Sequence, residues 1–130
     1  MIYLDTSALV KLVIQEPESP ALEDWLDRQH ALPKLSSQVA TVELIRTCRP
    51  LSDAAVSNAR QLLAGVDLVP LSEDLVEAAA LLGPLELRSV DAIHLASALS
   101  MADRLSSFVV YDGRLGAAAE SAGLPVASPA

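Results

Sequence analysis

Short apolar runs that fit β-strands alternate along this 130-residue chain with longer segments whose apolar residues recur at helical spacing. Strands are expected at 2–4, 33–36, 67–71 and 107–111, with a last short one at Val126. Helices are expected at 6–14, 21–30, 38–49, 53–65, 72–83, 90–105 and 113–122, with Ser37, Ser52, Ser72 and Ser89 in capping roles. This alternation predicts a single domain, residues 1–130, with an α/β sandwich fold and a mostly parallel central sheet.

Four acidic residues interrupt this pattern, each at a place where its neighbours belong in a core. Asp5 and Asp112 follow predicted strands, Asp91 falls in the first turn of a helix, and Glu43 lies in the middle of an apolar helix. Carboxylates lose free energy when they leave water, so such positions usually carry a partner or a cation. Sites in open parallel sheets form beyond the carboxyl ends of the strands. Asp5 and Asp112 are therefore expected at that edge, and a site forms if the fold brings Glu43 and Asp91 to them.

Several carboxylates without a nearby cysteine point to metal-assisted phosphoryl transfer, because Mg²⁺ and Mn²⁺ prefer oxygen ligands. Two such ions about 3.5–4 Å apart can activate water and stabilise a leaving oxygen. The hydroxyls of Thr6 and Ser7 are candidates to orient Asp5 or to bind a phosphate. His94, three residues after Asp91, fits either a proton shuttle or a packed helix histidine.

Each acid also has a purely structural interpretation. Asp5 fits the capping position of the first helix, and Glu43 fits an ion pair with Arg46 one turn further along its helix. Asp91 fits an ordinary first-turn acid, and Asp112 fits a turn before a glycine. It is the conjunction of the four that favours a functional site.

Composition and charge narrow the classes of protein. The chain is 52% hydrophobic and carries a net charge of −8, which argues against tight nucleic-acid binding by charge alone. Arg46, Arg49, Arg88 and Arg114 stand near the acids in sequence, which fits either a locally basic rim or ordinary solvated arginines. The single cysteine, Cys48, permits no internal disulfide. With no signal-peptide pattern and no long apolar run, a soluble cytoplasmic protein is expected.

Four motifs, LDTSAL, VELIR, DAIHLASA and VVYDGRL, occur in this order along the chain. Together they resemble the PIN-domain ribonucleases, and most of all the VapC toxins of VapBC toxin–antitoxin pairs. The resemblance implies a three-layer α/β/α PIN-like fold with Mg²⁺ or Mn²⁺ held by catalytic residues Asp5, Glu43, Asp91 and Asp112. It also implies that metal-activated water cleaves RNA and that the hydroxyl beside the first acid corresponds to Thr6 or Ser7.

The same resemblance implies a homodimer and a VapB-type antitoxin that inserts a basic side chain at the acidic site. The antitoxin supplies the DNA binding in such pairs, so no direct DNA binding and no membrane association are expected of this chain. One position departs from the family pattern: Val110 stands where many members carry Thr or Ser, two residues before the last acid.

Two other classes of function compete with this interpretation. A haloacid-dehalogenase-like phosphatase or a response-regulator receiver also places an Asp at a strand end. The phosphatase needs a second Asp where this chain has Ser7, and both usually need a late lysine, whereas the only lysines are Lys11 and Lys34. A degenerate, non-catalytic PIN-like binding module is the other alternative, which Val110 keeps open although all four acids are present.

Overall fold

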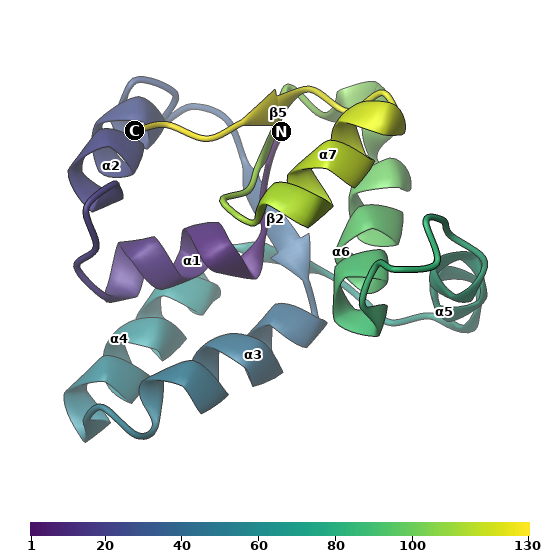
Figure 1. The fold of residues 1–130 in the computed structure, drawn as a ribbon. Helices are drawn as coiled ribbons and strands as arrows, with labels where there is room; N and C mark the ends of the chain where they lie inside the picture. Colours follow the sequence, from purple (N-terminus) through teal and green to yellow (C-terminus); the bar gives the residue numbers. More distant parts are fainter.

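Five strands and seven α-helices make up the computed structural model, which describes all 130 residues (Figure 1). The strands are β1 (Ile2–Leu4), β2 (Lys34–Ser37), β3 (Asp67–Val69), β4 (Ser107–Val109) and β5 (Val126–Ala127). The helices are α1 (Thr6–Val13), α2 (Ser19–Asp27), α3 (Val39–Cys48), α4 (Asp53–Ala64), α5 (Glu73–Ala80), α6 (Ser89–Leu99) and α7 (Gly113–Ser121), with a 3₁₀ turn at Ala102–Arg104. None of the helices combines the length and the apolar character that crossing a membrane requires.

The sheet has the strand order β3-β2-β1-β4-β5, and every neighbouring pair is parallel. From β1 the chain moves outward through β2 to β3, then returns to place β4 on the other side of β1. The direction of winding therefore reverses between β1 and β4, and ligands bind at such a reversal beyond the carboxyl ends of the strands. Asp5 directly follows β1 and Asp112 lies three residues after β4, so both stand at this point.

The two faces of the sheet bury different helices because successive strand residues point to opposite sides. Ile2 and Leu4 lie in a core with α1 to α4, whereas Tyr3 lies in a second core with α6 and α7. A third, smaller cluster packs α5 against the outside of α6. Figure 1 shows α1, α3 and α4 on one side of β2 and α5 and α6 on the other. The three-layer arrangement expected from the sequence is confirmed.

The sixth helix is shorter than its apolar pattern suggested, and its predicted end at Leu105 is wrong. It ends at Leu99, where the Ser100 hydroxyl donates a hydrogen bond to the carbonyl of Ser97. A continuing helix would give that carbonyl to the Met101 amide, so the side chain competes with the helix. The 3₁₀ turn that follows brings Leu105 into the core beneath the sheet.

Serine capping was predicted correctly at three helices and wrongly at a fourth. The side chains of Ser52 and Ser72 accept amide hydrogen bonds at the first turns of α4 and α5. The hydroxyl of Ser37 likewise accepts the amide of Val39, the first residue of α3, at 3.1 Å, whereas Ser89 is itself the first residue of α6. The fifth helix ends at Ala80, earlier than its Gly-Pro stop signal implied.

The core around α3 provides a test of this packing. Leu44 is fully buried between α3 and the sheet, whereas Leu51, just after the same helix, is 58% exposed. Leu44→Ala should lower the free energy of unfolding by about 2–5 kcal/mol, because it removes buried apolar contacts and leaves a cavity. Leu51→Ala is the matched control and should change it by about 0.5 kcal/mol or less. Equal losses in urea unfolding would contradict the described core.

Candidate active site

Asp5 is held in place by the residue two positions further along the chain. It is 5% exposed and caps α1, with Oδ2 accepting hydrogen bonds from the amide (3.1 Å) and hydroxyl (2.6 Å) of Ser7. The same Ser7 Oγ accepts the amide of Tyr111, at 3.0 Å. Ser7 therefore orients Asp5 and also connects the end of β1 to the segment after β4. The capping interpretation of Asp5 and its place in an acidic site are compatible.

Glu43 reaches the site through a buried hydrogen-bond network. Its Oε1 accepts the Thr6 hydroxyl at 2.6 Å and lies 2.7 Å from Nε2 of His94. The Nδ1 of His94 lies 2.8 Å from the hydroxyl of Tyr3. Burial raises the pKa of Tyr3, so its hydroxyl stays protonated and can donate a hydrogen bond to Nδ1, which leaves Nε2 to donate to Glu43. Thr6 thus serves Glu43 rather than Asp5.

Asp91 and Asp112 share one arginine. The Nε of Arg88 lies 3.3 Å from Asp91 Oδ2, and its Nη2 lies 3.8 Å from Asp112 Oδ2. Asp112 also caps α7, with Oδ1 accepting the amides of Arg114 and Leu115. The turn interpretation of Asp112 is therefore correct in part, but its second oxygen faces the same arginine as Asp91.

Burial and neighbouring charges shift the pKa values of two of the acids, Asp91 and Glu43. Burial raises the pKa of Asp91, and the carboxylates of Asp112 and Asp5 raise it further against the opposing effect of Arg88. Burial alone would raise the pKa of Glu43, but the hydrogen bonds from His94 and Thr6, together with nearby charges, lower it. Asp5, Asp91 and Asp112 are thus coupled through the pKa of Asp91, whereas Glu43 responds to His94, Thr6 and Arg88.

Each carboxylate has one anchored oxygen and one oxygen without a hydrogen bond. The anchors are Ser7 for Asp5, Thr6 and His94 for Glu43, Arg88 for Asp91, and the first turn of α7 for Asp112. No fully buried side-chain oxygen or nitrogen lacks a partner, so each of the four remaining oxygens keeps some contact with solvent. That of Asp5 lies 3.6 Å from His94 Nε2, and that of Asp112 lies 3.8 Å from Arg88 Nη2. Free carboxylate oxygens are the donor type that suits a hard divalent cation. No group of three or more ligand side chains is already arranged to hold one.

The arginines divide into two groups. Arg88 and Arg114 line a hollow of about 250 Å³ together with Asp91 and Asp112. Arg46 and Arg49 line a different hollow, and Glu43 makes no ion pair with Arg46. The basic rim suggested by the sequence is therefore present beside the last two acids. The bridging role of Arg88 and the hydroxyl of Tyr3 were not predicted, although Arg88 stands three residues before Asp91, the helical spacing for a pair.

His94 and Val110 are both buried next to the acids. His94 is fully buried, as the packed-histidine interpretation requires, but it packs against a site residue. Val110 is also buried, in the core with α7, and donates no side-chain hydrogen bond to Asp112. The capping amides of α7 hold Asp112 in its place.

A family model for the PIN domain matches residues 2–121 of the chain. Three proteins of Mycobacterium tuberculosis are similar over almost its whole length. Ribonuclease VapC47 is 43% identical, covering 99% of this chain and 97% of its own length. Ribonuclease VapC46 is 40% identical (98% and 97%), and Ribonuclease VapC35 is 42% identical (99% and 97%). The chain therefore belongs to the PIN-domain family and, within it, to the VapC group.

Solved structures of this group have the same fold. The Sarcin-Ricin loop cleaving toxin VapC20 of Mycobacterium tuberculosis matches with a TM-score of 0.74 at 21% identity, covering 99% of this chain and 100% of that one. VapBC2 from Rickettsia felis, solved bound to a DNA fragment from its promoter, matches with a TM-score of 0.72 at 14% identity over 100% of both chains. At such low identities the likeness shows the fold alone, and it agrees with the α/β prediction.

The raised pKa of Asp91 gives stability a specific pH dependence. A carboxyl whose pKa is raised on folding contributes stability below its unfolded value, about 3.9, and loses it as the pH rises through the folded value. Asp91→Asn removes that loss. In EDTA, the variant should therefore gain stability relative to the wild type as the pH rises from about 4 to 7.

Asp24→Asn is the matched control, since Asp24 is exposed and pairs with Arg28 on the same helix. Exposed pairs contribute little, so this variant should stay within about 0.5 kcal/mol of the wild type at every pH. Urea unfolding across the pH series measures both. An Asp91→Asn protein that loses stability towards neutral pH would show that the Arg88 contact outweighs the burial of Asp91.

Proposed function

We propose that the protein is a Mg²⁺- or Mn²⁺-dependent endoribonuclease and the toxin of a type II toxin–antitoxin pair. The observation that carries this proposal is the set of four carboxylates at one edge of the sheet, each with one hydrogen-bonded oxygen and one that makes no hydrogen bond. The names of relatives 40% to 43% identical over nearly the whole chain, all called ribonucleases, support RNA as the substrate.

The residues that would hold a metal ion are Asp5, Glu43, Asp91 and Asp112, through the carboxylate oxygens that make no hydrogen bond. The chemistry that such an ion supplies when bound is activation of water and stabilisation of a leaving oxygen. The chain contributes the orientation of the ligands. Ser7 fixes Asp5, while Thr6 and His94 fix Glu43 and favour its ionised form. Side chains that are already held in place lose little conformational freedom when they bind a cation, and this favours binding.

Arg88 has a separate role in this arrangement. Its guanidinium supplies positive charge to Asp91 and Asp112 where an ion would otherwise do so. The side chain is 76% exposed, so it is free to move aside when a cation binds. Arg88 is thus a counter-charge that limits repulsion between the acids before a metal arrives.

A VapB-type antitoxin is the proposed partner. Solved neighbours include a toxin–antitoxin complex from Klebsiella pneumoniae and VapBC-1 from nontypeable Haemophilus influenzae, both with this fold. A negatively charged chain with an acidic edge suits a partner that presents a basic side chain there. Assembly as a homodimer and a cytoplasmic site of action complete the proposal.

Replacement of single acids tests the chemistry. Asp5→Asn, Glu43→Gln, Asp91→Asn and Asp112→Asn should each lower the rate of RNA cleavage by about 100-fold or more, since a metal contributes several kcal/mol to such reactions. Asp27→Asn, on the exposed surface of α2, is the control and should leave the rate unchanged. Cleavage is followed on single-stranded RNA with Mg²⁺ or Mn²⁺ and again with EDTA.

The same variants separate the enzyme from a binding module. Expression of the wild type should arrest growth, and Asp5→Asn should relieve the arrest. A wild-type protein that cleaves RNA no faster than Asp5→Asn and Asp91→Asn proteins would reject the ribonuclease and favour the non-catalytic alternative.

Metal binding should be visible without catalysis. Mg²⁺ at about 100 times its dissociation constant should stabilise the native protein by about 2.7 kcal/mol. At the same Mg²⁺ concentration, Arg88→Ala should show a larger gain than the wild type, because the guanidinium no longer competes for Asp91 and Asp112, whereas Arg28→Ala should behave as the wild type. Thermal unfolding with and without metal measures each difference. A melting temperature that metal leaves unchanged in all three proteins would count against a metal site.

A further inference from the structure

Beside the acidic hollow lies a larger groove of about 820 Å³, between α7 and the segment that joins α5 to α6. The two share three lining residues, Glu86, Leu87 and Arg114. An extended ligand that runs from the acids in this direction would therefore pass Arg114 and enter the groove. The two spaces form one continuous surface, although only the smaller one contains the proposed catalytic residues.

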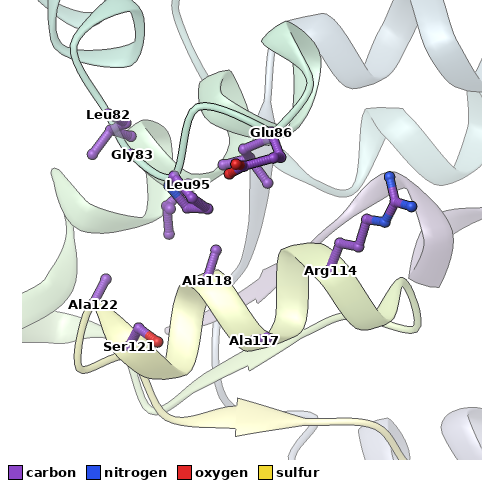
Figure 2. Close-up of a pocket in the computed structure, with 11 residues that line it drawn as sticks. Leu82, Gly83, Glu86, Leu95, Arg114, Ala117, Ala118, Ser121 and Ala122 are labelled. Atoms are coloured by element: carbon purple, nitrogen blue, oxygen red, sulfur yellow. The ribbon is translucent and has the colours of Figure 1, made fainter.

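Arg114 is the available positive charge at this junction. Arg88 is paired with Asp91 and Asp112, whereas Arg114 makes no ion pair. Its backbone is fixed, because its amide donates to Asp112 Oδ1 at 2.9 Å. In Figure 2 its side chain extends from the first turn of α7, away from the alanines further along the helix. Arg114 is therefore fixed next to Asp112 through its backbone, while its guanidinium makes no ion pair with that carboxylate.

The groove beyond Arg114 is apolar and formed by small side chains on one side. Ala118 and Ala122 follow Arg114 at intervals of four residues, on the same face of α7, and leave room above the helix. Leu82 and Leu95 form the opposite wall (Figure 2). The polar lining residues are Arg114 and Glu86, which the groove shares with the acidic hollow, and Ser121 further along α7. A mostly apolar space with few polar groups suits a flat ring attached to a charged group.

We propose that this surface binds one nucleotide of the RNA strand, next to the bond that is cleaved. Arg114 contacts its phosphate, and the apolar groove receives its sugar and base. The proposal rests on the ribonuclease function proposed above and extends it to the substrate. Arg114 adds an unpaired positive charge where a strand would leave the acids, and a phosphate contact there would fix the position of the strand. Single-stranded RNA suits such a site because its bases can turn outward.

The first experiment tests the phosphate contact. Arg114→Ala should raise KM for a cleaved single-stranded RNA about tenfold, with a smaller change in kcat, since the contact binds substrate beside the reacting bond. The slope of log KM against log salt should become shallower by about 0.7, the value for one lost phosphate contact on a single strand. Arg114→Lys should restore part of both.

Arg104→Ala is the matched control. Arg104 is likewise exposed and unpaired, but its 3₁₀ turn precedes β4, at the opposite edge of the sheet. This variant should leave KM and the salt slope unchanged. Equal effects of the two substitutions would overturn the phosphate assignment.

The second experiment tests the groove. RNA that lacks the base beside the cleaved bond should have a KM several-fold higher with the wild type. Ala117→Leu, at an exposed groove position, should raise KM for intact RNA and abolish the difference between the two RNAs. Ala54→Leu, exposed on α4, is the control and should keep the difference. Melting temperatures establish that all the variants fold.

The outcomes separate the proposals. If the wild type cleaves no RNA, the ribonuclease and this extension both fail. If it cleaves RNA but a missing base has no effect at either neighbouring position, the groove does not bind a base. If Ala117→Leu changes only the size of the protein on a sizing column, the groove is a protein interface and the proposal is overturned.

Discussion

Like charges repel, and this fold brings Asp5, Asp91 and Asp112 close enough to shift the pKa of Asp91. The surrounding structure stabilises these carboxylates against that repulsion. One oxygen of each acid is fixed by a hydroxyl, an imidazole, an arginine or helix amides. The parallel sheet contributes the framework, since its winding reverses between β1 and β4 and leaves space at their carboxyl ends. A stable core on both faces then offsets the unfavourable electrostatics.

Much of this arrangement could be predicted from the sequence. The alternation of strands and helices is strong, and Asp5 could be placed at a strand end because the apolar run before it is short and unambiguous. The four acids were recognisable by their apolar surroundings, and Ser7 by its position beside Asp5. These features are local, so they can be read from neighbouring residues.

What could not be predicted depends on contacts across the fold. The network from Tyr3 through His94 to Glu43 joins residues separated by 91 and 51 positions, and no local pattern shows it. The end of α6 was missed because Ser100 looks like any exposed helix residue until its hydroxyl takes a carbonyl from the backbone. Pairing of Arg88 with Asp112 likewise needs α6 and α7 to be packed together.

The side chain of Tyr3 contributes both to the core and to the hydrogen-bond network of the site. Its ring stacks on Phe108 inside the sheet, with 5.2 Å between centroids, while its oxygen meets His94. Packing and chemistry therefore constrain the same side chain, and a phenylalanine would satisfy only the first. If expression of the protein is toxic, a genetic selection for surviving cells would collect substitutions at this strand as well as at the acids. Such survivors would carry a folded protein altered at a position that never meets its substrate.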